Sequence, residues 1–84
     1  MSTAYISLVS EAELALAAAA QRLAKSRQIL KDFLAEHADQ VPAPELRESW
    51  ERERDVLETE VDEAQRVFRK CQEDLAELKK PDGR

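Results

Sequence analysis

Residues 57–78 read LETEVDEAQRVFRKCQEDLAEL, and their apolar or small residues recur at alternating spacings of four and three. This spacing keeps the side chains on one stripe of an α-helix, and a sustained stripe is typical of a helix that packs against another helix. The seam formed in this way consists of Leu57, Val61, Ala64, Phe68, Cys71, Leu75 and Leu78. The second half of the chain is therefore predicted to be a long helix with a helical neighbour.

The first half of the chain carries a matching seam. One seam position is held by Val9, Leu16, Leu23, Leu30 and His37, and the other is held by Tyr5, Ala12, Ala19, Ser26 and Phe33. Two polar residues, Ser26 and Arg54, interrupt the otherwise apolar seams. A polar layer of this kind costs stability but can fix the register or the choice of partner.

Two prolines, Pro42 and Pro44, mark the internal break in the helical pattern, because proline disfavours helix in the residue before it. We predict one domain over residues 1–84, with helices at about 3–38 and 44–80, a hinge at 39–43 and a tail at 81–84. A short link makes two long helices antiparallel neighbours. The predicted fold is therefore all-α, an antiparallel two-helix hairpin that resembles a coiled coil.

The start of the first helix stays open at this point. Ser10 and Glu13 read as a capping box, which starts the helix at Ser10 and leaves residues 1–9 as an arm that can add to a sheet edge of a partner. Tyr5 and Val9 continue the heptad pattern and favour an earlier start.

The register of the hairpin also stays open. In the first register, Leu30 faces Trp50 and Ser26 faces Arg54. In the second register, Leu30 faces Leu57, and Trp50 lies beside His37. Both registers alternate large with small side chains, as close packing requires.

Apolar residues beyond the seams imply a partner, because a two-helix seam uses only two positions per heptad. We expect a dimer or a helical partner protein to complete the hairpin into a bundle. The candidate interface residues are Leu8, Leu14, Ile29, Leu34, Trp50, Val56 and Val67. The predicted function is a non-enzymatic protein–protein interaction module, acting as a small self-associating adaptor, chaperone or subunit.

An acidic patch favours an alternative function. It consists of Asp55, Glu58, Glu60, Asp62 and Glu63. Such a patch can dock on a basic protein surface, since complementary charge speeds encounter. The alternative is a small acidic inhibitor that blocks a basic, nucleic-acid-binding site on a target protein.

Composition argues against several other classes. The net charge of −5 is wrong for a nucleic-acid binder or for docking on an anionic membrane. The sequence has no apolar run near the ~20 residues of a membrane span, and Met1–Val9 has no basic start typical of a signal peptide, so we expect a cytoplasmic protein. One cysteine and one histidine provide neither an internal disulfide nor a zinc site. We expect no catalytic, cofactor, metal or small-molecule site.

The outline of two long helices joined by a short link is similar to that of the WXG-type secreted proteins. Their signature is a Trp-x-Gly motif at the turn between the helices. Here Trp50 is followed by Glu51 and Arg52, and the only glycine is Gly83. The motif is absent, so no function is transferred from that family.

Overall fold

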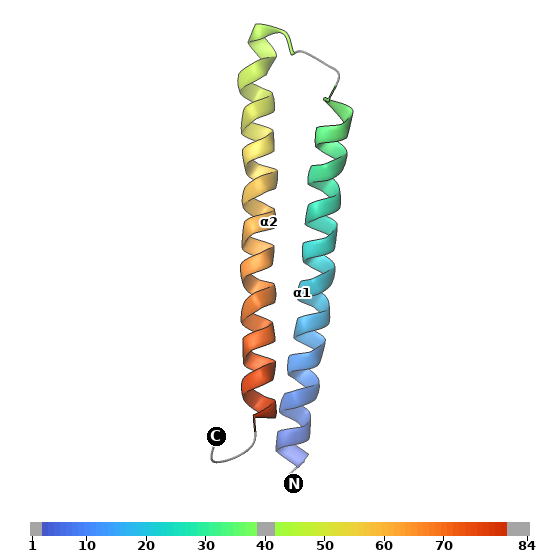
Figure 1. Ribbon diagram of the computed structural model, residues 1–84, viewed down its shortest axis with the longest axis vertical. Helices are drawn as coiled ribbons and strands as arrows, with labels where there is room; N and C mark the ends of the chain where they lie inside the picture. Colours follow the sequence, from blue (N-terminus) through green and yellow to red (C-terminus); the bar gives the residue numbers. More distant parts are fainter. Residues whose placement is uncertain (1–2, 39–41, 81–84) are drawn as a thin grey trace.

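The computed structural model describes residues 3–38 and 42–80, which form two α-helices and contain no β-strand. Helix α1 spans Thr3–Glu36 and helix α2 spans Pro44–Lys79. They lie side by side and run in opposite directions, so that the start of α1 lies beside the end of α2 (Figure 1). The expectation of an all-α chain with two helices is confirmed for this part of the chain. The predicted tail, 81–84, lies outside the described residues, as do residues 39–41 of the hinge.

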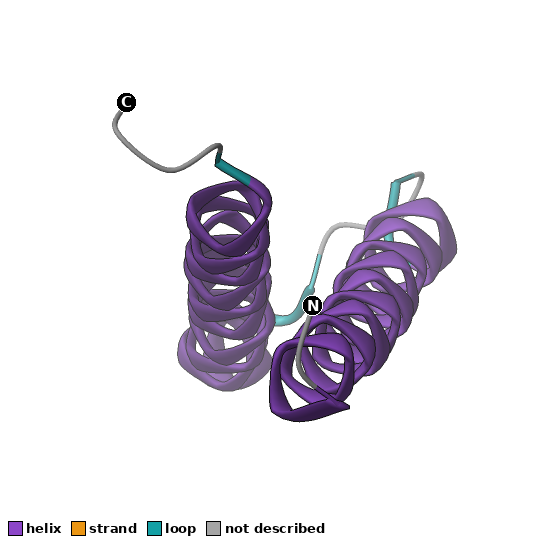
Figure 2. Cartoon of the chain, turned by 90° about the horizontal axis from the view of Figure 1, so that it is seen from below, coloured by secondary structure: helices purple, strands orange, loops and turns teal. Residues whose placement is uncertain are grey.

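The hairpin is a long rod that measures 63 × 18 × 16 Å. Its radius of gyration is 19.0 Å, whereas a compact domain of this length has one of about 12 Å. Seen along the rod, the two helix axes are inclined to each other (Figure 2). The core is therefore a single seam between two helices, with no further layer over the described residues.

Helix α1 has the earlier of the two starts left open by the sequence, at Thr3. The Tyr5 hydroxyl donates a hydrogen bond of 2.6 Å to the carbonyl oxygen of Leu78, which ties the first turns of α1 to the last turn of α2. The interpretation of residues 3–9 as an extended arm is wrong. The first turn of α1 has no acidic residue and its last turn no basic residue, so charges do not offset its dipole. Its helicity depends on alanine-rich sequence and on packing against α2.

Helix α2 begins at Pro44, where the missing N–H of proline costs no hydrogen bond. The carbonyl of Ala43 accepts hydrogen bonds from the backbone N–H groups of Leu46 (2.8 Å) and Arg47 (3.1 Å). At the other end, Lys80 is extended, and its N–H donates to the Glu77 carbonyl at 3.3 Å. Lys79 lies in the last turn, where a cation suits the helix dipole.

The buried side chains all lie on the predicted seams. Among the described residues they are Ala19, Leu23, Ser26, Phe33 and Ala64. Ala64 is the best covered, with 0% of its surface exposed. Because the distance between packed helices depends on the side chains at the contact, this alanine lets α1 approach closely near the middle of α2.

Contacts near the hinge and near the middle of the rod select the second register. The ring centroids of His37 and Trp50 are 4.0 Å apart, with the rings edge to face. The Ser26 hydroxyl lies 3.4 Å from a Glu60 carboxylate oxygen, so it does not face Arg54, which is more than one turn away along α2. The pairings of the first register are therefore excluded.

The close approach at Ala64 is testable with Ala64→Leu. We expect this larger side chain to push the helices apart and to lower the free energy of unfolding by about 1–3 kcal/mol. Ala76→Leu is the matched control, because Ala76 is exposed on the same helix and a surface change of this kind alters stability by about 0.5 kcal/mol or less. Urea unfolding followed by far-UV circular dichroism measures both variants. Equal effects of the two substitutions contradict the packing described here.

Candidate functional site

Two ion pairs that join the helices define two sides of the rod. Arg22 Nε lies 2.9 Å from a Glu60 carboxylate oxygen, and Lys79 Nζ lies 3.4 Å from a Glu13 carboxylate oxygen. Arg22 and Glu13 are nine residues apart on α1, so their side chains point in directions about 180° apart around the helix axis. The two ion pairs therefore lie on opposite sides of the hairpin.

Most of the exposed apolar side chains share the side of the Arg22–Glu60 pair. Residues seven apart on a helix differ in direction by only about 20°, and residues four apart by about 40°. By this rule Ile29 and Leu8 point the same way as Arg22, while Val67, Leu46 and Val56 point the same way as Glu60. We call this surface the Arg22 face, and its apolar residues are Leu8, Ile29, Leu46, Val56 and Val67. Their exposed fractions run from 38% for Val67 to 63% for Val56.

The structure does not gather all seven predicted interface residues on one surface. Leu8, Ile29, Val56 and Val67 are on the Arg22 face, but Leu34 is on the opposite side with Ile6. Leu14, 72% exposed, points outward from α1, away from α2. Trp50 is half-buried at the hinge end, against His37.

Leu46 belongs to the Arg22 face, although the sequence prediction did not include it among the interface residues. Its exposed fraction is 48%. The signal that identifies it is its spacing, since Leu46, Glu60 and Val67 are separated by multiples of seven.

The Arg22–Glu60 pair is the electrostatic centre of this face. Two guanidinium nitrogens of Arg22 donate to the two carboxylate oxygens of Glu60, at 2.9 and 3.1 Å. These hydrogen bonds lower the pKa of Glu60 below its ordinary value of 4.5, and they raise the pKa of Arg22. The buried Ser26 hydroxyl donates to the Arg22 carbonyl at 2.7 Å and lies beside the same carboxylate. The exposed fractions of the two charged side chains are 41% and 44%, so water still reaches the pair.

The five residues of the predicted acidic patch do not form one surface. Glu60 is paired with Arg22, and Glu63 lies next to the Arg22 face. Asp55 lines a shallow hollow on α2 together with Val56, Glu60 and Glu63. Glu58 and Asp62 lie on the other side of α2, where they are exposed. The patch is thus divided between two sides, and one of its members is neutralised by a cation of the same chain.

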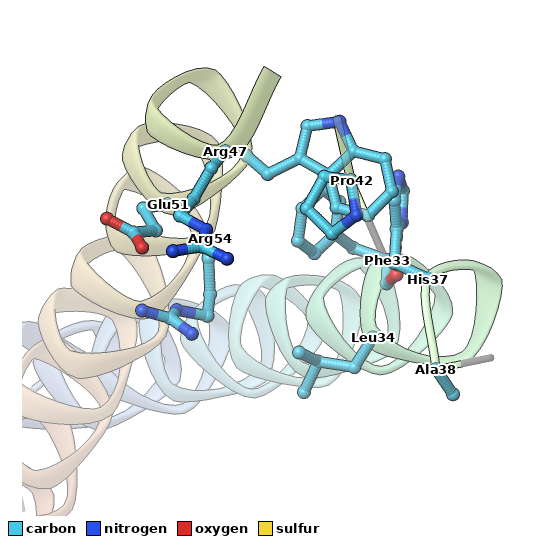
Figure 3. A pocket seen from close by; sticks show the side chains of 9 residues that line it. Phe33, Leu34, His37, Ala38, Pro42, Arg47, Glu51 and Arg54 are labelled. Carbon is cyan, nitrogen blue, oxygen red and sulfur yellow. Dashed lines mark hydrogen bonds between the residues drawn. The ribbon is translucent and has the colours of Figure 1, made fainter. Parts of the chain in front are cut away.

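A cleft of about 300 Å³ lies at the hinge end of the rod. Its floor is aromatic: the Phe33 and His37 ring centroids are 4.4 Å apart, and Trp50 packs edge to face on His37. Arg47 and Arg54 line it from α2, and Leu34 lines it from α1 (Figure 3).

The chemistry of this cleft follows from its lining. The Nδ1 of His37 lies 2.8 Å from the Phe33 carbonyl, which can only accept, so this nitrogen carries the hydrogen. No serine, threonine, cysteine or lysine is among the described residues that line the cleft. The cleft is the hinge end of the seam, where the rings of Phe33, His37 and Trp50 pack together.

Neither the described helices nor the known proteins assign a membrane span, a metal site or a family to this chain. Over residues 3–38 and 42–80, neither helix has an apolar segment of the length that crosses a bilayer. In the same residues, no three histidine, cysteine or acidic side chains are grouped as metal ligands. Comparison with protein-family models, with curated proteins and with solved structures finds no match to this chain.

The pKa shift of Glu60 predicts a pH-dependent contribution to stability. Because its pKa is lowered on folding, the Arg22–Glu60 pair stabilises the hairpin above about pH 4.5, and this contribution is lost as the pH falls through the lowered pKa. We expect Glu60→Gln to unfold at lower urea concentration than the unmodified chain at neutral pH, and the difference to vanish in acid. The effect is small, because the pair is exposed to water and salt.

Glu58→Gln is the control for this measurement, since Glu58 forms no ion pair within the described residues. Both variants are compared at one protein concentration, at neutral pH and at a pH well below 4.5. A Glu60→Gln defect that is equally large at both pH values contradicts the assigned role of the ion pair.

Proposed function

We propose that this protein is a non-enzymatic interaction module that self-associates through the Arg22 face to complete a helical bundle. The observation that carries the proposal is the clustering of five exposed apolar side chains on one side of the rod. An exposed apolar surface with a polar rim marks a protein–protein interaction site. Burial of this face against a second copy would account for the apolar residues that the seam between α1 and α2 does not use.

The surface area of the chain supports a partner. It exposes 6664 Å², whereas a compact monomer of this mass exposes about 5,100 Å². A specific interface of standard size removes about 800 Å² from each partner. The excess surface of the rod is large enough for one such interface. Burying it would add apolar contacts to a domain whose own core is small, and would therefore stabilise the fold.

The charges of the Arg22 face favour a second copy as the partner. Arg22 and Glu60 provide one cation and one anion that are already side by side. A twofold axis brings the same patch of two copies together, so that the cation of each copy can meet the anion of the other. A face with this pattern is complementary to itself.

Light scattering and thermal unfolding over a range of concentrations test the proposal. We expect a dimer mass and a melting temperature that rises with protein concentration. Ile29→Glu places a charge on the Arg22 face and is expected to weaken dimerisation about tenfold or more, since burying an unpaired charge costs over 1.4 kcal/mol.

Leu34→Glu is the matched control for Ile29→Glu. The exposed fractions of the two residues are 46% and 45%, but they lie on opposite sides of the rod. Far-UV circular dichroism confirms that both variants remain helical. A monomeric unmodified chain, or equal loss of dimer in the two variants, overturns the proposal.

A further inference from the structure

The Arg22 face restricts how a second copy can sit on it, an inference that rests on the proposed function. Two rods that meet through the same side have two twofold arrangements. With the hinge ends opposed, α1 meets α1 and α2 meets α2. With the hinge ends together, α1 of each copy meets α2 of the other. We infer that the rods pack with their hinge ends together, about a twofold axis that runs parallel to them.

The α2 half of the Arg22 face is acidic, and this disfavours the opposed arrangement. Residues at steps of seven from Glu60 and from Val56 point the same way as those two residues. The charged residues in these two rows are Glu53, Glu60, Glu63, Lys70, Asp74 and Glu77. Opposed rods would place these rows against the same rows of the second copy, so that carboxylates would meet carboxylates across the interface.

The α1 half of the face carries cations that suit this acidic surface. With the hinge ends together, the axis leaves every residue at its own height, so residues that are level within one rod are also level across the interface. The Ser26 hydroxyl lies 3.4 Å from a Glu60 carboxylate oxygen, which fixes these levels. Because α1 and α2 run in opposite directions (Figure 1), one residue back along α1 corresponds to one residue forward along α2.

The cations of α1 then lie opposite the acidic residues at the middle of α2. Lys25 lies between the heights of Glu60 and Glu63 of the second copy, and Arg22 lies beside its Glu63. Lys25 has no ion pair within the described part of its own chain. The second copy therefore provides carboxylates for a cation that its own rod leaves without one.

The apolar residues near the middle match in the same alignment. Ile29 lies beside Val56 of the second copy, and both side chains are exposed in the single rod. Val67 lies beside Ala18 of the second copy, which is exposed and small enough to let the facing helices approach closely. Twofold symmetry forms each of these contacts twice.

Toward the ends of the rods the match is weaker. Asp32 lies beside Glu53 of the second copy, and Glu11 lies beside Asp74. Asp74 is already held by Lys70 of its own chain, at 3.0 Å. The contact is therefore centred on the middle of the rods, around Arg22 and Glu60.

Distances between spin labels test the arrangement. Glu45, Thr59 and Glu73 are exposed on α2 at steps of fourteen, so they point in similar directions, outside the Arg22 face, and differ in height. Each is replaced by cysteine in turn and labelled, with Cys71→Ser to remove the only natural thiol. We expect pulsed electron paramagnetic resonance to give three distances below about 35 Å in the dimer, because packed helix axes lie only about 8–10 Å apart.

Opposed rods would give a different pattern, and Thr59→Cys is the internal control. Glu45 and Glu73 are about 42 Å apart along α2, at a rise of about 1.5 Å per residue. Wherever a perpendicular axis crosses the rods, at least one of these two labels would then be about 40 Å or more from its counterpart. Thr59 is near the middle of α2, where the labels can be close in both arrangements.

A charge exchange gives an independent readout in the unmodified cysteine background. We expect Lys25→Glu to weaken the dimer about tenfold, since each dimer contains this contact twice. We expect the further change Glu63→Lys to restore the dimer. Glu58→Lys is the matched control, because it gives the same net charge on the opposite side of α2, and we expect it not to restore the dimer.

The outcomes separate this inference from the proposed function. A dimer by light scattering in which the label at Glu45→Cys or Glu73→Cys gives a distance above about 40 Å overturns the arrangement and leaves self-association standing. Rescue of Lys25→Glu by Glu58→Lys as effectively as by Glu63→Lys also overturns it. A chain that is monomeric at all concentrations overturns both.

Discussion

The two seams of α1 and α2 pack against each other along the rod, and over the described residues nothing else covers them. Their closest contact is at Ala64, which has 0% of its surface exposed. A core of this kind is one side chain deep, so a residue one position away from the seam is already half in water. Apolar side chains such as Ile29 and Val67 are exposed because a two-helix rod has no second layer to cover them. This geometry is the reason for proposing a partner.

The heptad pattern predicted the seams because the seam residues repeat along most of each helix, and the buried residues Leu23, Phe33 and Ala64 are among those it named. It could not select the register, since both alignments alternate large with small residues. The contact of His37 with Trp50 decided between them, and its geometry depends on where the hinge places α2. The sequence prediction also grouped the apolar residues beside the seam into one interface and did not separate the two sides of the rod. Ile29 and Leu34 both lie beside the seam, but on opposite sides of it. The interhelical ion pairs distinguish those sides.

The polar layer at Ser26 shows how a hydroxyl can occupy a core position at little cost. Its hydrogen bond to the Arg22 carbonyl satisfies the buried oxygen within the same helix. Its position also leaves room for Glu60 to reach Arg22 from the other helix. An ion pair as exposed as this one adds little to stability. It nevertheless excludes registers in which Glu60 faces an apolar residue, so its main effect is on specificity.

The same reasoning separates affinity from specificity in the proposed dimer. Covering the Arg22–Glu60 pair with a second copy removes water from four charges, and the cost of doing so offsets much of the gain from their attraction. The apolar side chains of the Arg22 face, among them Ile29 and Val67, must therefore provide most of the binding free energy, because their burial carries no such penalty. The charges act on specificity, because an alignment that leaves an arginine or a carboxylate of this face against an apolar side chain is disfavoured. Apolar residues alone would allow the rods to slide, and charges alone would hold them weakly. The Arg22 face combines the two in one repeating pattern.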